Sequence, residues 1–270
     1  MKNNTITVLA LFIAISSCHK KYDTPEPSIT DASNVLLKDV NIERLPSPYF
    51  TFQYDNSGFV THVDFASKMI GWRVQYENNR VIRMVDSNGD SLNYSYDKNQ
   101  VISIRHTKAA SGEKTWHYEF IYYNSELLKE IKYWSFANGS TDSVLSRKVD
   151  LQYSPDNNLT EYDDFNVDAN GSLSLVARVK FTGYDNGKNV DDFYLLKNFF
   201  EDFLYLPQIK LQRNNPALQM YEGAVEDFTF EYKYSYNGDN IPVEKNANVS
   251  ITRGPNTGQK FTSRSQYTYY

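Results

Sequence analysis

Apolar residues recur at short, regular distances behind a series of tyrosines. An apolar residue stands five or six positions after each tyrosine and a second follows three positions later, as Val81 and Met84 follow Tyr76. The tyrosines that open these units are Tyr54, Tyr76, Tyr96, Tyr123, Tyr153, Tyr184 and Tyr236, and the pattern fades at the last. Recurrence at roughly 20 to 30 residues is typical of a repeat built from one supersecondary unit.

Turn-forming residues fill the gaps between the apolar positions. Asp55-Asn56-Ser57-Gly58 and similar stretches follow the tyrosines, and a second set of turns lies between them, at Asn88-Gly89, Asn138-Gly139 and Asn170-Gly171. Asn-Gly between β-forming residues predicts a two-residue hairpin turn in which both residues take positive φ. The two sets alternate, so each is predicted to mark one edge of a meandering sheet.

Two-residue turns would bring residues of matching chemistry face to face. The predicted pairs are Val85 with Leu92, Phe165 with Val176, and Asp163 with Arg178. Cross-strand pairs of this kind each contribute roughly 0.2–1 kcal/mol.

The turns are frequent enough for about a dozen strands or more, and open twisted sheets rarely exceed ~10 strands without curling or splitting. The sequence therefore predicts a mainly all-β fold, in which residues 35–270 form one large antiparallel meander curled into an open barrel or shell. A propeller is the alternative, but its four-stranded blades need a period of roughly 40 residues.

One stretch breaks the β pattern. Between residues 191 and 206 the apolar residues Phe193, Leu196, Phe199, Phe200, Phe203 and Leu204 follow the spacing of a helix face. The sequence predicts a short helix here, packed on the concave face of the sheet and filling the core. A plug or lid is the alternative interpretation.

Residues 1–17 have the composition of a secretion signal. Lys2 precedes an apolar run from Ile6 to Ile15, and these ten residues are too few to cross a bilayer as a helix. The following Ser16-Ser17 and Cys18 resemble the lipobox of bacterial lipoproteins, which implies cleavage before Cys18 and its acylation, for instance with palmitate. The alternative is an ordinary signal with a chance cysteine, although Cys18 is the only cysteine in the chain.

Residues 18–34 are polar, contain two prolines and show no apolar periodicity, so they are predicted to form a flexible tether. The expected partner of this segment is the outer membrane, reached through the lipid. Some surface-exported lipoproteins carry acidic residues directly after the cysteine, whereas this chain has His19, Lys20 and Lys21. The periplasmic face and the cell surface therefore both stay open.

The Tyr-Asp units carry a family resemblance. "YDNSG", "YDKN" and "YDNG" resemble the YD repeats of Rhs-type proteins, whose strands wind into a shell. Together with the lipobox and the closing "YSYNGDNIPV", they are similar to uncharacterised Bacteroidetes lipoproteins with YD-like hairpin repeats. The resemblance implies a β shell over residues 50–270. Rhs shells enclose a C-terminal toxin after an autoproteolytic segment, and no such segment is recognisable in this chain.

The composition of the chain limits the kinds of partner and cofactor that it is expected to bind. A net charge of −5 without clustered basic residues argues against a nucleic-acid partner. No phosphate-binding glycine loop or His-Glu-x-x-His motif is present, so no cofactor is predicted. Aromatic residues make up 15% of the chain. They favour a half-buried pleated surface over carbohydrate stacking, because they stand at the repeat positions.

Two sets of residues are weak metal candidates. His106 and His117 would face each other across a turn at Ser111-Gly112, but no third ligand is evident. Asn166, Asp168 and Asn170 resemble the front of a calcium loop, although Ala177 stands where the bidentate Glu would be. A polar hairpin turn is the simpler interpretation.

No catalytic residue is predicted. Three carboxylate pairs, Asp163-Asp164, Asp191-Asp192 and Glu201-Asp202, raise a glycosidase as an alternative. Adjacent carboxylates on a strand point to opposite faces, which argues against it. The sequence favours a non-catalytic, membrane-anchored envelope lipoprotein that binds a protein, glycan or lipid or serves a structural role. The alternative is a glycan-processing enzyme of the envelope.

Overall fold

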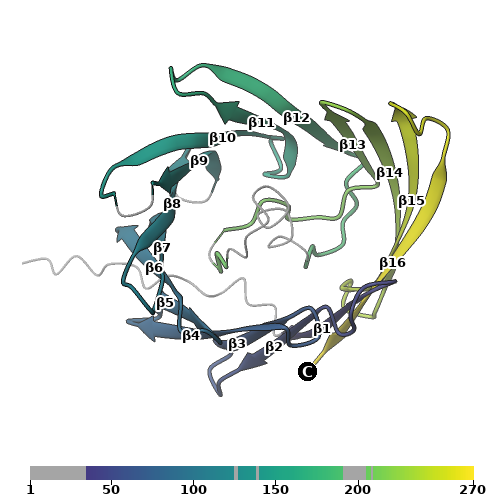
Figure 1. Ribbon diagram of the computed structural model, residues 1–270. Coiled ribbons are helices and arrows are strands. Elements are labelled where there is room, and N and C mark those ends of the chain that lie inside the picture. The colour runs from purple at the N-terminus through teal and green to yellow at the C-terminus, as the bar shows by residue number, and fades with distance from the viewer. Residues whose placement is uncertain (1–34, 125–126, 138–139, 191–204, 208) are drawn as a thin grey trace, which may run out of the picture. The chain divides into compact units, whose positions relative to one another are not determined.

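The computed structural model describes residues 35–124, 127–137, 140–190, 205–207 and 209–270. They form sixteen antiparallel strands in one closed barrel, seen end-on in Figure 1. The strands are β1 (Leu37–Ile42), β2 (Phe50–Tyr54), β3 (Val60–Phe65), β4 (Ile70–Glu77), β5 (Arg80–Asp86), β6 (Ser91–Asp97), β7 (Gln100–Thr107), β8 (Lys114–Tyr122), β9 (Leu128–Phe136), β10 (Ser143–Tyr153), β11 (Leu159–Val167), β12 (Leu173–Thr182), β13 (Leu218–Gly223), β14 (Asp227–Tyr236), β15 (Pro242–Arg253) and β16 (Lys260–Tyr269).

The all-β antiparallel meander is confirmed, but the expected open barrel is wrong, because the sheet closes. β1 pairs with β16 through five residue pairs, among them Val40 with Tyr267. Closure removes both free edges of the sheet, which would otherwise expose unpaired backbone groups. The propeller alternative is excluded by the same topology.

No helix is found among the described residues. The predicted helix over 191–206 falls almost wholly outside them, because only Tyr205 and Leu206 at its end are described. The predicted signal peptide (1–17) and tether (18–34) also lie outside the described residues and stay predictions. The barrel belongs to a compact unit that runs from Asn34 to Tyr270.

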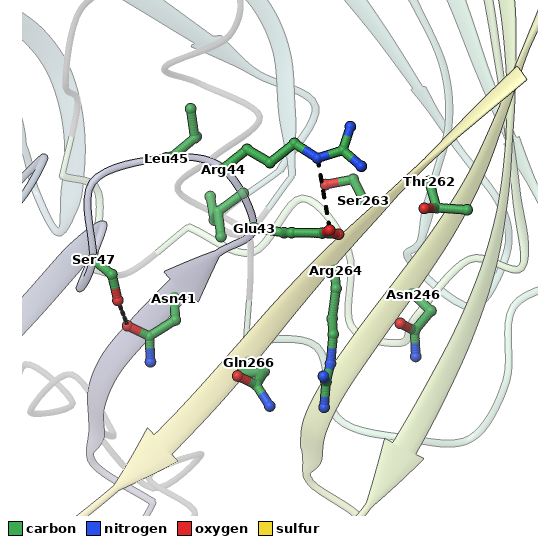
Figure 2. Close-up of a pocket in the computed structure, with 11 residues that line it drawn as sticks. Asn41, Glu43, Arg44, Leu45, Ser47, Asn246, Thr262, Ser263, Arg264 and Gln266 are labelled. Carbon is green, nitrogen blue, oxygen red and sulfur yellow. Dashed lines mark hydrogen bonds and ion pairs between the residues drawn. The ribbon is translucent and has the colours of Figure 1, made fainter.

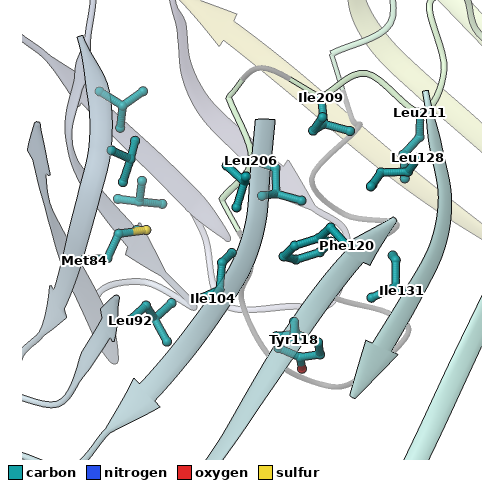
Figure 3. Packing of buried hydrophobic residues seen from close by; sticks show 14 of the residues in the cluster. Met84, Leu92, Ile104, Tyr118, Phe120, Leu128, Ile131, Leu206, Ile209 and Leu211 are labelled. Carbon is teal, nitrogen blue, oxygen red and sulfur yellow. The ribbon is translucent and has the colours of Figure 1, made fainter. Parts of the chain in front are cut away.

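The apolar positions of the repeat form the inner face of the barrel. In the first five complete units they are buried to at least 93%, namely Val60, Val63, Val81, Met84, Val101, Ile104, Leu128, Ile131, Leu159 and Tyr162. Figure 3 shows Met84, Ile104, Leu128 and Ile131, which come from the alternate strands β5, β7 and β9. Full burial of each large apolar side chain contributes roughly 1.5–3 kcal/mol, so the repeat encodes the core.

A bulge explains why the buried positions are three residues apart, although alternation in a strand predicts two. Tyr96 faces Val101 while Ser95 faces Ser103, so Ile102 is an extra residue that points outward. Six strands contain an extra residue at the equivalent position, namely Thr61, Ile82, Ile102, Lys129, Thr160 and Val243. Bulges bend a strand and increase its twist, which is the curvature that closure needs.

The repeated tyrosines fasten the open ends of the hairpins. Several donate the hydroxyl to a carbonyl at the start of the preceding strand: Tyr54 to Leu37 (2.8 Å), Tyr96 to Val81 (2.9 Å) and Tyr122 to Val101 (2.6 Å). Tyr236 instead bonds the carboxylate of Asp185. In the fourth unit the role therefore falls to Tyr122, not to Tyr123. These rings are half-buried in the wall, which supports the structural interpretation of the tyrosines over sugar stacking.

The turns at Asn88-Gly89 and Asn170-Gly171 are three-residue loops, so the predicted two-residue turns are wrong there, whereas Asn138-Gly139 lies outside the described residues. Gly89 takes a φ of 88°, whereas Asn88 does not enter the positive region. The carboxylate of Asp86 accepts the N–H groups of Asn88 (2.9 Å) and Asp90 (2.8 Å), which stabilises the longer loop. The register moves by one residue, and Leu92 faces Met84 instead of Val85.

The second Asn-Gly hairpin shows the same loop and one confirmed pair. Asp163 faces Arg178 as predicted. A bulge at Val176 then shifts the register, and Phe165 faces Leu175 instead. The predicted pairing is therefore right for Asp163 with Arg178 and wrong for Phe165, which lies between the bulge and the loop.

Part of the β12–β13 connection lies inside the barrel (Figure 1). Leu206, Ile209 and Leu211 are buried against the inner side chains of the strands, as Figure 3 shows. Tyr94 donates its hydroxyl to the carbonyl of Tyr205 at 2.9 Å. The described part of the connection thus packs against the inner face of the wall.

Asn158 holds this internal segment to the wall. Its side-chain oxygen accepts the N–H groups of Arg213 (2.8 Å) and Asn214 (2.9 Å). Its amide nitrogen donates to Oδ1 of Asn214 at 3.1 Å. Asn158 is only 3% exposed, so these bonds replace water that the buried groups would otherwise need.

Candidate functional site

The two histidines proposed as a metal pair lie on opposite faces of the wall. The strand register sets Arg105, not His106, opposite His117. His106 stacks on Trp116 with ring centroids 5.0 Å apart, and its Nδ1 lies 2.5 Å from Oγ1 of Thr115. The expected facing of His106 and His117 is therefore wrong, because the loop between β7 and β8 has four residues instead of two and a bulge sets His106 opposite both Thr115 and Trp116 of β8.

His117 belongs to an aromatic cluster on the outer face. Its ring is parallel to Trp134, with centroids 5.8 Å apart, and lies 5.5 Å from Phe136. Burial lowers the pKa of His117, while Glu119 opposes this shift and Arg105 adds to it. The imidazole is thus a largely neutral packing partner for Trp134 near neutral pH.

The calcium candidates form a hairpin loop. The Asp168 carboxylate accepts the backbone N–H groups of Asn170 (2.8 Å) and Ser172 (2.8 Å). This repeats the arrangement of the loop at Asp86. Asn166 faces Arg147 and lies on the strand before the loop. The Asp168 oxygen that would bind calcium is thus already bonded to the backbone.

Asp163 and Asp164 point to opposite faces of β11, as predicted. Asp163 lies outside and accepts two bonds of 2.6 Å from Arg178. Asp164 is 4% exposed and forms a two-bond ion pair with Arg147. Each carboxylate is neutralised by its own arginine, an arrangement that suits structure better than acid–base chemistry. The pairs Asp191-Asp192 and Glu201-Asp202 lie outside the described residues.

Within the described ranges, no group of three or more His, Cys, Asp and Glu side chains is placed to hold a metal ion. In the same ranges, no helix is long and apolar enough to cross a membrane.

Charged side chains cover the outer face of β9 and β10. Nζ of Lys148 lies 3.2 Å from Glu130 and 3.0 Å from Asp150, and Lys132 approaches Glu130 at 3.1 Å. Burial alone would raise the pKa of Glu130, but hydrogen bonds from Lys132 and Lys148 bring it below its ordinary value. These residues alternate with the fully buried Ile131 and Val149.

The charged covering continues across β11, β12 and β13. Besides its bonds to Asp163, Arg178 lies 3.6 Å from Glu161, and Lys180 lies 3.4 Å from Glu222. Between Arg178 and Lys180, Val179 is fully buried inside. Over these five consecutive strands the outer face is therefore charged, and the inner face is largely apolar apart from the ion pair of Asp164 with Arg147.

One surface cavity is a notch in the rim, where β16 extends past the end of β1 (Figure 2). It has a volume of about 440 Å³. Three parts of the chain line it: the end of β1 with the loop after it (Asn41, Ile42, Glu43, Arg44, Leu45, Ser47), β15 (Asn246) and β16 (Thr262, Ser263, Arg264, Gln266). Most of these side chains carry hydrogen-bonding groups.

A smaller cavity of about 290 Å³ occupies a second notch in the same rim. There β12 extends past the last pair of β13, which joins Ala177 and Gly223. Arg253 closes one side of it through two bonds of 2.7 Å to Asp227. Neither notch was predicted from the sequence, because each depends on how far neighbouring strands extend in the closed barrel.

Two solved structures resemble this barrel. A porin-like protein from Bacteroides uniformis aligns at 14% identity over 82% of this chain and 89% of its own, with a TM-score of 0.56. A porin-like protein from Bacteroides vulgatus aligns at 17% identity over 82% and 92%, with a TM-score of 0.52. These likenesses show a shared β-barrel fold.

A chain of TcdB2-TccC3 also aligns, at 12% identity over 78% of this chain and 14% of its own. Its TM-score of 0.27 does not establish a common overall fold. No family model matches this chain, and no curated protein matches it significantly in sequence.

Proposed function

We propose that this chain is a non-catalytic lipoprotein of the cell envelope, whose barrel stands in water on a lipid tether and binds a partner. The lipobox-like segment at Cys18 supports the anchor. The fold shared with two Bacteroides proteins described as porin-like supports an envelope location. The outer membrane is the membrane that we expect to hold the lipid.

The polarity of the wall is the observation that carries this proposal. A barrel that spans a membrane presents an outward apolar band about 25 Å tall, and each Arg or Lys at the bilayer midplane costs roughly 2–4 kcal/mol. Here Lys132, Lys148 and Arg178 stand outward between buried apolar residues of the same strands. Such a surface favours water over lipid.

The described interior supports the same conclusion. A conducting barrel leaves an aqueous channel lined by polar residues. In this barrel Leu206, Ile209 and Leu211 pack against apolar side chains of the strands. We therefore infer a binding or structural role for the outer surface and rim instead of transport through the centre.

The anchor is tested by replacing its cysteine. Cys18→Ala should leave a protein that is soluble after cell disruption, whereas the parent partitions with outer membranes. Ser17→Ala, which keeps a small residue before the cysteine, should behave like the parent. A Cys18→Ala protein that still resists alkaline extraction from membranes would show that the barrel itself is inserted.

The wall is tested with the purified full chain in planar lipid bilayers. We expect no conductance steps above those of a detergent blank. Regular single-channel steps would contradict the water-facing wall whatever the result for Cys18.

A further inference from the structure

The rim notch at β16 contains a free strand edge. β1 ends at Ile42, which faces Ser265, whereas β16 begins five residues earlier, at Lys260. The last bond between the two parts runs from the N–H of Glu43 to the carbonyl of Arg264, at 2.8 Å. Lys260 to Ser263 therefore have β15 on one side and no strand on the other.

The backbone groups on this edge can be assigned from the register. In an antiparallel strand the N–H and C=O of one residue point to the same edge, and successive residues alternate. The backbone carbonyl of Arg264 faces β1, so the backbone N–H and C=O groups of Thr262 and Lys260 face the same edge. Residues at odd-numbered positions point to the opposite edge, toward β15. The carbonyl of Gln259, for example, accepts the N–H of Ile251 in β15 at 3.0 Å. Among the described residues, no hydrogen bond from the β1–β2 loop reaches Thr262 or Lys260.

Side chains frame the edge in a way that suits an extended chain. Figure 2 shows Arg44 and Leu45 above β16, with Thr262 on the free part of that strand and Asn246 on the next strand. On the inner face Phe261 is 45% exposed, which is unusual for this core-facing side of the barrel. One apolar side chain on a neighbouring strand would cover Phe261.

We propose that this edge receives an extended peptide segment of a partner protein, which adds one strand antiparallel to β16 in line with β1. The proposal rests on the binding role proposed above and names its partner class. The added strand continues the ladder that β1 already makes with β16, using the open N–H and C=O groups of Thr262 and Lys260. Main-chain bonds hold the segment, and alternate side chains select it.

The pairing of the added strand with β16 determines which peptide positions should be polar and which apolar. Peptide residues that bond to Thr262 have outward side chains beside those of Thr262 and Arg264, so polar residues fit there. The intervening residues face inward, toward Phe261, so apolar residues fit there. A glycan is disfavoured because no aromatic residue is among those that line the cavity, and the exposed ring of Phe261 lies on the inner face of the wall instead.

The test uses a fluorescein-labelled peptide, Lys-Thr-Val-Thr-Val-Thr-Lys, and the purified full chain in detergent, followed by fluorescence anisotropy. We expect saturable binding. Thr262→Pro removes an edge N–H that faces no neighbouring strand, so affinity should fall about tenfold. Thr262→Val keeps the N–H and the shape, and should bind like the parent.

Two N-methylated peptides test the orientation without altering the protein. Methyl groups on the threonine nitrogens block the edge that faces β16, and should weaken binding at least tenfold. Methyl groups on the valine nitrogens lie on the far edge, and should change affinity less than about twofold. This comparison stays valid if Thr262→Pro does not fold.

Several results would overturn the proposal. They are the absence of saturable binding up to millimolar peptide, or equal effects of the two methylation patterns. A concentration-dependent dimer that Thr262→Pro abolishes would assign the edge to a second copy of this chain instead. Channel activity in bilayers would refute the water-facing wall without affecting the peptide result, so the two failures are distinguishable.

Discussion

Replacing Asn158 by alanine isolates the attachment of the internal segment to the wall. The change removes one side chain that is 3% exposed and leaves the N–H groups of Arg213 and Asn214 without their acceptor. Each hydrogen bond of this kind contributes about 0.5–1.5 kcal/mol net. Asn158 makes three of them to the segment, so their loss costs roughly 1.5–4.5 kcal/mol, a large part of the roughly 5–15 kcal/mol that stabilises a typical domain.

The effect is measurable by thermal unfolding. For a domain of this size each kcal/mol shifts Tm by roughly 2–4 °C, so a loss of about 3 kcal/mol lowers Tm by about 6–12 °C. Asp156→Ala is the matched control, because Asp156 is an exposed residue of the same turn. Its Tm should stay within about 2 °C of the parent.

Hydrogen exchange then identifies the cause. In Asn158→Ala the amides of Arg213 and Asn214 should exchange faster, whereas that of the wall residue Val149 should change only as far as global stability does. If Asn158→Ala and Asp156→Ala melt alike and both amides keep their protection, Asn158 does not hold the segment and the reasoning is refuted.

Three further changes test the packing, the outer face and the bulges. In Gly187→Ala the added Cβ would lie 2.5 Å from Cε1 of Tyr236, so a loss of about 1–3 kcal/mol is expected in urea unfolding, whereas Gly238→Ala has nothing within 4 Å and should be neutral. Because burial lowers the pKa of His117, the unfolded chain binds a proton at this residue more readily than the folded chain does. The free energy of unfolding should therefore fall as the pH drops below about 6.5. His117→Asn should flatten this dependence between about pH 7.5 and 5, and an unchanged slope would contradict the reasoning. Deleting Ile102 restores simple alternation with the inner side chains unchanged, so a Tm equal to that of the parent would show that this bulge does not bend the wall.

The sequence predicted the inside of the barrel better than its register. Val81 and Met84 were recognised as a recurring apolar pair, and both are buried. The turn at Asn88-Gly89 was misjudged by one residue, because the Asp86 carboxylate stabilises a three-residue loop that dipeptide statistics do not distinguish. Only the burial of Leu92 opposite Met84 settles the register.

The candidate binding edge was beyond the reach of the sequence. It exists because Ile42 ends β1 while β16 continues to Lys260, and these strands are more than 200 residues apart in the chain. Closure of the barrel brings them together, and closure is the one feature that the expected open sheet lacked. A signal was present in the exposed Phe261, an aromatic residue at an inward position, but its exposure becomes visible only in the folded wall.

The three-residue step of the repeat connects sequence and shape. In a regular strand a step of three would send one of two apolar residues to the outer face. The bulged residue, such as Ile102 between Val101 and Ile104, absorbs this mismatch and keeps both neighbours inside. It also bends the strand, and six repetitions around one rim supply curvature from every part of the sheet. The same device therefore keeps both apolar residues of each unit inside the barrel while it bends the wall toward closure.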